Sequence, residues 1–118
     1  MAKSQLLPPD VKKRLKDFVL GPDYDLSVAW VSSAVIHKIN LTYRHKDKPT
    51  NILSFPLGPN EGEILLCREL MEDQEAVPLF IHGLVHLKGY DHGSRMEQEE
   101  KKVIDFFNSH ATNYHRRP

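Results

Sequence analysis

The hydrophobic positions of this chain follow two different spacings. In four stretches the apolar residues recur every three or four positions, which predicts amphipathic helices. In three shorter stretches, β-branched and other apolar residues lie together between Gly, Pro or Asn residues, which predicts strands. In chain order we expect a helix over 11–20, a strand over 26–31, a helix over 33–44, strands over 52–55 and 62–67, and helices over about 78–88 and 94–108. This order predicts one small α/β (α+β) domain over residues 1–118, with one mostly parallel β-sheet covered by helices.

Turn and capping residues predict where these elements end. Ser32 or Ser33 can cap the helix over 33–44. Pro56 is expected to stop the second strand, and Gly89 to end the helix that precedes it in a left-handed conformation. The apolar stripes predict the helix residues that face the core, which are Val11, Leu15, Phe18 and Val19, then Val35, Ile36, Ile39 and Leu41 or Tyr43, and finally Met96, Val103, Ile104 and Phe107.

The composition is that of an ordinary globular chain. Hydrophobic residues make up 40% and charged residues 27%, and the formal net charge is zero, so any attraction to nucleic acid must come from a local patch. No apolar run approaches the roughly 18 to 20 residues of a membrane span, and the first residues lack an apolar signal core. Cys67 is the single cysteine of the sequence, which excludes an intrachain disulfide. We therefore expect a cytoplasmic protein that does not enter a membrane.

Three histidines with the spacing of metal ligands lie in and just after the helix over about 78–88. His82 and His86 are four residues apart, so a helix places both imidazoles on one face, separated by roughly 6 Å along its axis. Gly89 lets the chain turn back, and His92 can then supply a third ligand. Three histidines leave a fourth coordination position open, which is typical of a catalytic zinc site. Zinc suits three imidazoles best, although nickel or copper can occupy the same nitrogens in vitro.

The residue after the first histidine decides which chemistry such a site can support. A zinc peptidase with this spacing carries its catalytic glutamate there, but this chain has Gly83. The loss of a positioned base typically costs about 10²- to 10⁴-fold in rate, so peptide hydrolysis by the usual route is not expected. A metal ion also acts as a Lewis acid, which suits a charged substrate such as a phosphodiester.

Three stretches carry longer motifs, namely INLTYRHKDKPTNILSFPL (39–57), GEILLC (62–67) and HGLVHLKGYDH (82–92). In this order they resemble the LNxxYRxKDxPTDVLSFP, GDIVIC and HGxLHLxGYDH segments of the YbeY family of metal-dependent endoribonucleases, which act in ribosomal RNA maturation. The order of the three segments is also that of the family. Between Cys67 and His82 the chain is shorter than is usual for the family.

The resemblance implies one zinc ion per chain, held by His82, His86 and His92 on a zincin-like metal helix. It also implies an arginine at the mouth of the metal cleft that engages RNA phosphate, here Arg44, so that Arg44 and His82 are the expected catalytic residues. The implied function is a single-strand-specific endoribonuclease in ribosomal RNA processing, including maturation of the small-subunit RNA 3′ end, and in ribosome quality control. The implied partners are single-stranded regions of ribosomal RNA, small-subunit proteins and an assembly GTPase.

Several alternatives stay open at this level. His45, Lys46 and Lys48 beside Arg44 either contact RNA or form a solvated turn. Asp91 either accepts an imidazole N–H or caps the turn. The attacking oxygen belongs either to water or to the ribose 2′-hydroxyl. Two other functions are consistent with the same residues: a non-catalytic ribosome assembly factor in which zinc holds the fold, and a zinc hydrolase of another substrate such as a peptide.

Overall fold

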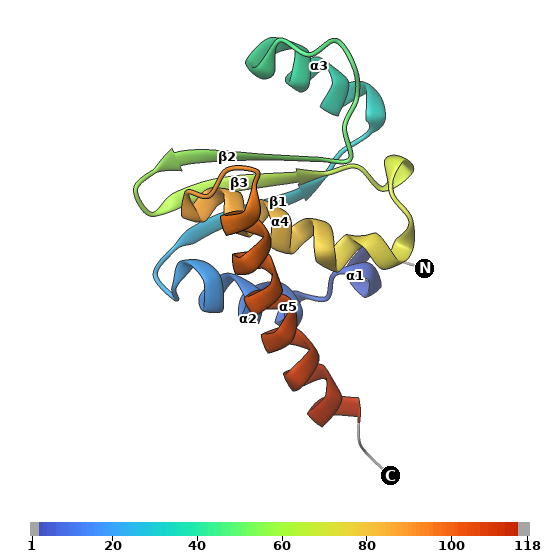
Figure 1. The fold of residues 1–118 in the computed structure, drawn as a ribbon. Coiled ribbons are helices and arrows are strands. Elements are labelled where there is room, and N and C mark those ends of the chain that lie inside the picture. Colours follow the sequence, from blue (N-terminus) through green and yellow to red (C-terminus); the bar gives the residue numbers. More distant parts are fainter. Residues whose placement is uncertain (1–2, 116–118) are drawn as a thin grey trace.

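The computed structural model describes residues 3–115, with side chains described from Gln5 to Ser109. Within this range the chain forms five α-helices, three strands and two short 3₁₀ helices, arranged as Figure 1 shows. In chain order these are α1 (Lys3–Leu6), α2 (Pro9–Leu20), β1 (Asp25–Trp30), α3 (Ser33–Arg44), β2 (Ile52–Gly58), β3 (Glu61–Leu66), η1 (Arg68–Leu70), η2 (Asp73–Glu75), α4 (Ala76–Lys88) and α5 (Ser94–His115).

The three strands form one mixed sheet in the order β1-β3-β2. β1 pairs with β3 in parallel, whereas β2 pairs with β3 antiparallel. The prediction of a mostly parallel sheet is therefore wrong. Only Pro59 and Asn60 join β2 to β3, which is enough for a hairpin but far too short for the crossover that parallel neighbours need. The parallel pairing of β1 with β3 is reached through α3 and β2, which lie between them in the chain.

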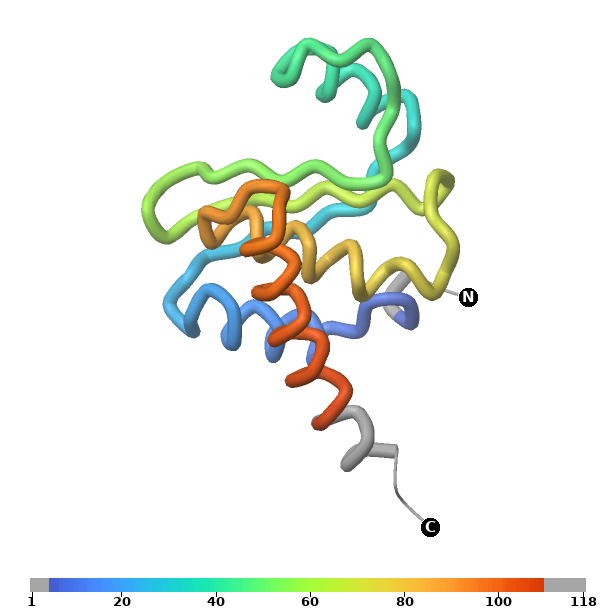
Figure 2. The backbone as a smooth tube through the Cα atoms, viewed as in Figure 1, coloured from blue at the N-terminus to red at the C-terminus, as the bar shows by residue number. Residues whose placement is uncertain are grey.

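Helices cover both faces of this sheet (Figure 1). α4 packs against β2 and β3 on one face, with α2 and α5 packed against α4, while α3 lies on the opposite face and stands apart from the other helices (Figure 2). Successive side chains of β3 point to opposite faces of the sheet. Ile64 and Leu66 belong to the main core with α4, and Leu65 packs with Ile36 and Leu53 under α3. The sheet thus separates a large core from a small one.

All seven predicted helices and strands are present, which confirms the small α/β domain. α2 begins two residues before its predicted start, β1 and β3 each begin and end one residue earlier than predicted, and three further ends differ. α4 begins at Ala76, two residues before Pro78, and α5 continues to His115. β2 continues through Pro56 to Gly58, with a shift in register at this point. An edge strand tolerates proline because one of its sides has no neighbour to receive a backbone N–H.

The predicted core is right at about half of the helix positions. Leu15, Val19, Ile36, Met96 and Val103 are buried, and Val11, Ile39 and Phe107 are partly buried. The predicted core residues that the structure instead exposes are Phe18, Val35, Leu41, Tyr43 and Ile104. Three of these lie on α3, whose buried residues are only Ile36 and Asn40, because a helix that packs on one side buries a narrow stripe.

The stretch between β3 and α4 consists of the two 3₁₀ helices and little else. At η2, Glu72 and Glu75 form a reciprocal capping box, which satisfies backbone N–H groups at the point where α4 begins. This short connection brings the start of α4 directly back to the sheet. No helix in residues 3–115 combines the length and apolar character that a membrane span requires.

Candidate metal centre

α4 holds His82 and His86 on one side of a helix whose other sides are mostly in the core. Phe80, Ile81, Leu84 and Val85 are all buried, so apolar packing fixes the helix and leaves the two imidazoles facing outward. The helix ends at Gly89, which has a φ of 114° and donates its N–H to the carbonyl of His86. Glycine adopts this left-handed conformation without the strain that a side chain would cause.

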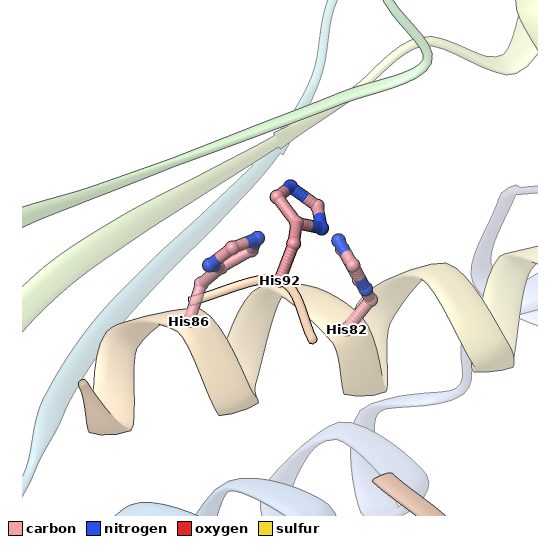
Figure 3. A group of neighbouring side chains, drawn as sticks. All are labelled: His82, His86 and His92. Atoms are coloured by element: carbon pink, nitrogen blue, oxygen red, sulfur yellow. The ribbon is translucent and has the colours of Figure 1, made fainter. Parts of the chain in front are cut away.

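His92 reaches the same place through the turn that follows α4. Gly93, with a φ of 139°, completes the reversal, and α5 then begins at Ser94. Figure 3 shows the three imidazoles pointing toward one another from α4 and the turn. Their candidate ligand atoms all lie within 4.8 Å of one another. Ligands around a tetrahedral zinc ion at 2.1 Å are separated by about 3.4 Å, so small ring rotations would allow His82, His86 and His92 to share one ion.

Two hydrogen bonds orient the rings of α4. The Nδ1 atom of His82 lies 3.2 Å from each carboxylate oxygen of Glu100, and the Nδ1 atom of His86 lies 2.9 Å from the carbonyl oxygen of Tyr90. An ionised carboxylate and a carbonyl only accept hydrogen bonds, so Nδ1 carries the proton in both neutral rings. The Nε2 atom of each ring is therefore left as the ligand atom, which is the arrangement that metal-binding histidines commonly show.

The electrostatic surroundings of His86 favour its neutral form. Burial lowers the pKa of His86, and the nearby charges of His82, His92 and Arg44 lower it further, while the hydrogen bond to the carbonyl of Tyr90 acts in the opposite direction. Only a neutral imidazole has a lone pair for a metal ion. The lowered pKa of His86 thus favours the form of the ring that can bind a metal ion.

Gly83 lies where α4 packs closely against the sheet. A Cβ atom at this position would be 3.0 Å from Cδ1 of Ile64 and 3.1 Å from Cδ1 of Ile52, which is tighter than ordinary van der Waals contact. A side chain at position 83 would therefore require the side chains of Ile64 and Ile52 to move by a few tenths of an ångström. Gly83, which stands where a zinc peptidase has its base, is thus part of the close packing between α4 and the sheet.

A cleft of about 780 Å³ runs past the histidines along β2. Its lining includes the three histidines, Glu100, and residues 51–54 at the start of β2. It also includes Arg44, Lys46 and Lys48 from the end of α3 and the loop that follows. β2 is an edge strand, and α3 and α4 pack against it from opposite faces of the sheet. The cleft along this edge is therefore lined by residues from both helices.

Comparison with known proteins agrees with the motifs in the sequence. The family model described as Endoribonuclease YbeY matches residues 5–108. The chain belongs to the YbeY family. The Endoribonuclease YbeY of Rubrobacter xylanophilus is 45% identical over 80 residues, which are 64% of this chain and 58% of that protein. The chain thus matches less than two thirds of that relative's length. A solution structure of a Thermotoga maritima protein is similar, with 28% identity and a TM-score of 0.58 over 96% of this chain and 89% of that chain.

Most of the YbeY-type residues predicted from the sequence lie in the cleft. Arg44, Lys46 and Lys48 line it with the three histidines. His45 does not line it; with a φ of 58°, this residue caps the C-terminus of α3. The imidazole N–H groups of His82 and His86 are accepted by Glu100 and by the Tyr90 carbonyl, so Asp91 does not have this role for either ring.

Two residues of the cleft are missing from the sequence-based prediction. Glu100 contacts His82, and Asn40 is buried with its Nδ2 group donating to the carbonyl of Lys48 at 2.9 Å. A weak signal for both exists in the sequence: Asn40 follows Ile36 by four residues, and Glu100 follows Met96 by four. Each polar side chain therefore falls on the apolar stripe of its helix, where an unpartnered polar group would be costly.

Proposed function

We propose that this chain is a zinc-dependent endoribonuclease that cuts single-stranded RNA during ribosomal RNA processing. The observation that carries the proposal is that one cleft contains both a convergent set of imidazoles and a group of cations. The imidazoles are those of His82, His86 and His92, and the cations are those of Arg44, Lys46 and Lys48. Membership of the YbeY family supports RNA as the substrate.

The three histidines would hold the metal, with α4 acting as a zincin-like metal helix that lacks the peptidase glutamate. Three imidazole donors fit zinc well, and in this chain the Nδ1 protons of His82 and His86 are directed to acceptors, which leaves Nε2 for coordination. When bound, such an ion would supply Lewis-acid chemistry to a phosphate group. As a ligand of this ion, His82 would act as a catalytic residue.

The cations would bind and orient the RNA backbone. The guanidinium of Arg44 can donate two parallel hydrogen bonds to one phosphate, which a lysine cannot reproduce. Lys46 and Lys48 would attract the adjacent phosphates, and the neutral net charge of the chain makes this local group the main source of attraction. The cleft of about 780 Å³ would receive part of a single strand.

The test is cleavage of an RNA that has a folded core and single-stranded ends. We expect the zinc-loaded protein to cut only the unpaired segments, and the metal-free protein and the His86→Ala variant to be inactive. Equal cleavage by all three preparations would identify a contaminating nuclease and contradict the proposal. The product ends also identify the attacking oxygen: attack by the 2′-hydroxyl expels the 5′-oxygen and leaves a 2′,3′-cyclic phosphate, whereas attack by water leaves no cyclic product.

We further propose, from the family, that this activity serves maturation of the small-subunit RNA 3′ end and ribosome quality control in the cytoplasm. Small-subunit proteins and an assembly GTPase are the proposed protein partners. Depletion of the protein in its own cell should lead to accumulation of small-subunit RNA with an extended 3′ end. Unchanged RNA ends after depletion would separate the nuclease activity from this pathway.

A non-catalytic assembly factor is the second candidate, favoured by the zero net charge of the chain, which predicts weak binding to RNA alone. Here zinc would hold α4, the turn and α5 together, and binding to the ribosome would be the activity. Removal of zinc would then unfold the domain, and no cleavage would occur in any buffer. Peptide hydrolysis is disfavoured because Gly83 stands where a zinc peptidase has its catalytic glutamate; a protease assay with saturating zinc tests it.

A further inference from the structure

Glu100 is the one carboxylate that lines the cleft in direct hydrogen-bond contact with a candidate metal ligand, among the residues that the structure describes. Both of its oxygens lie 3.2 Å from Nδ1 of His82. The side chains of His82 and Glu100 are 28% and 23% exposed, so the contact is partly shielded from water. A charge-assisted hydrogen bond in such surroundings is stronger than one at the open surface.

The position of Glu100 on α5 is set by the packing of that helix. Met96 and Val103 on either side of it are buried in the main core, so Glu100 lies on the same stripe of the helix as these apolar residues. An ion pair of 2.9 Å between Lys88 and Glu99 also connects α4 with α5. Because the chain reverses after Gly89, Glu100 and His92 both lie on the same side of α4.

The partners of the two α4 histidines differ in charge. His86 donates to the neutral carbonyl of Tyr90, whereas His82 donates to the carboxylate of Glu100. A carboxylate holds the proton on Nδ1 more strongly than a carbonyl does, and it increases the electron density at Nε2. In metal sites such a partner fixes both the tautomer and the orientation of the ligand ring, and its removal typically weakens metal binding about 10- to 100-fold.

We propose that Glu100 is a positioning residue of the metal site: it keeps His82 in the Nδ1–H form with Nε2 directed at the point where the three histidines converge. It acts through His82 and does not itself touch the ion. The inference rests on the metal site of the proposed function.

The first test is the affinity for zinc, measured by competition with a chromophoric chelator. We expect Glu100→Ala to bind zinc about 10- to 100-fold more weakly than the unmodified protein. Glu100→Gln should lose less, because the amide oxygen still accepts the hydrogen bond without the charge. The matched control is Glu97→Ala, which removes an exposed carboxylate from the same helix and should change the affinity less than twofold. Zinc affinity of Glu100→Ala equal to that of the control would overturn the proposal.

The second test uses the metal-free protein, so it does not depend on zinc. Long-range ¹⁵N–¹H NMR at a pH of about 8, where imidazoles are neutral, should show His82 in the Nδ1–H form. The same spectrum of Glu100→Ala should show the Nε2–H form that predominates for imidazoles in water. An unchanged tautomer in the variant would contradict the role of Glu100, and thermal unfolding of both metal-free proteins would show whether the variant remains folded.

The two tests keep this inference separate from the proposed function. If the unmodified protein binds zinc no better than His86→Ala, the proposed metal site is wrong, and the tautomer of His82 alone decides whether Glu100 orients it. If the unmodified protein binds zinc well and Glu100→Ala does so equally, the metal site stands and only the role of Glu100 is wrong.

Discussion

The two walls of the cleft are built in different ways. We call His82, His86, His92 and Glu100 the histidine wall, and Arg44, Lys46 and Lys48 the basic wall. The histidine wall rests on α4, most of whose residues belong to the main core. The basic wall lies at the end of α3 and in the loop that follows. α3 stands apart from the other helices in Figure 2 and packs on a core of only four buried residues. Metal coordination needs ligands fixed to within fractions of an ångström, whereas attraction of phosphates needs only positive charge within reach.

The basic wall is nevertheless attached at one buried point. Asn40 donates its Nδ2 group to the carbonyl of Lys48, and its own carbonyl accepts the N–H of Lys46 at 3.3 Å. Both ends of the lysine-bearing loop are thus connected to α3 through the same residue. Regions with few buried contacts open locally more easily than the core, so we expect amide hydrogens of residues 45–50 to exchange faster than those of α4.

Removal of a ligand should disable the histidine wall and leave the basic wall intact. We expect His92→Ala to weaken zinc binding more than about 100-fold, because even the loss of a partner that only orients a ligand costs about 10- to 100-fold. Cleavage should fall with it. Binding of single-stranded RNA, measured in the presence of a chelator, should stay the same. Zinc affinity retained in His92→Ala would mean that the ligand set is different.

Removal of Arg44 should weaken the use of RNA and leave zinc binding intact. A hydrogen bond to a charged group is worth about 1.5–3 kcal/mol, so Arg44→Ala should lower kcat/KM for RNA by about 10- to 150-fold without changing zinc affinity. Arg44→Lys should recover only part of the loss, because an ammonium group lacks the bidentate geometry. The control Lys38→Ala removes the same charge from an exposed position of α3 that does not line the cleft. If Lys38→Ala lowered kcat/KM for RNA by the same factor, Arg44 would contribute only through the net charge of the protein.

The packing under the histidine wall can be tested at Gly83. Gly83→Val would bring methyl groups against Ile64 and Ile52, where a Cβ alone already comes within 3.0 and 3.1 Å. We expect the free energy of unfolding of the metal-free protein to fall by about 1–3 kcal/mol, as for other overpacked cores. Gly83→Ala should cost less, since alanine gains about 1 kcal/mol of helix propensity over glycine. Urea denaturation with an unchanged midpoint for Gly83→Val would show that α4 is not held closely to the sheet.

The difference between the histidine wall and the basic wall also explains which parts of the site could be predicted from the sequence. His82, His86 and His92 lie within eleven residues, so a helix and one turn are enough to bring them together. Arg44 is 38 residues away from His82 and enters the site only through the arrangement of α3 and β2. The spacing of residues along α3 does not indicate that Arg44 lines the cleft. This expectation comes only from the resemblance to the family motif.

The errors concern features that depend on tertiary packing. The exposure of Val35, Leu41 and Tyr43 reflects how α3 lies on the sheet, which the periodicity of α3 alone does not determine. Glu100 is polar and falls on an apolar stripe of α5, and a pattern of hydrophobic positions treats such a residue as an interruption. Polar residues on otherwise apolar faces are therefore the positions where a functional partner should be sought.

The smallest expected effect concerns the ion pair that holds α5 against α4. The hydrogen bond from Lys88 lowers the pKa of Glu99, and the charges of Lys88 and Lys102 lower it further, against the opposing effect of burial. The folded protein therefore binds fewer protons at this group than the unfolded chain does. The resulting stabilisation is complete above the unfolded pKa of about 4.5 and is lost as the pH falls through the lower pKa of the folded state.

Glu99→Gln should accordingly reduce the free energy of unfolding at neutral pH by less than about 1 kcal/mol, because Lys88 is 40% exposed and water screens the pair. The difference from the unmodified protein should shrink as the solution is acidified and vanish once Glu99 is protonated in both states. Glu97→Gln, on the exposed side of α5, should show no such dependence. A difference of constant size at all pH values would assign the effect of Glu99 to packing, and the ion pair with Lys88 would then contribute nothing to holding α5 against α4.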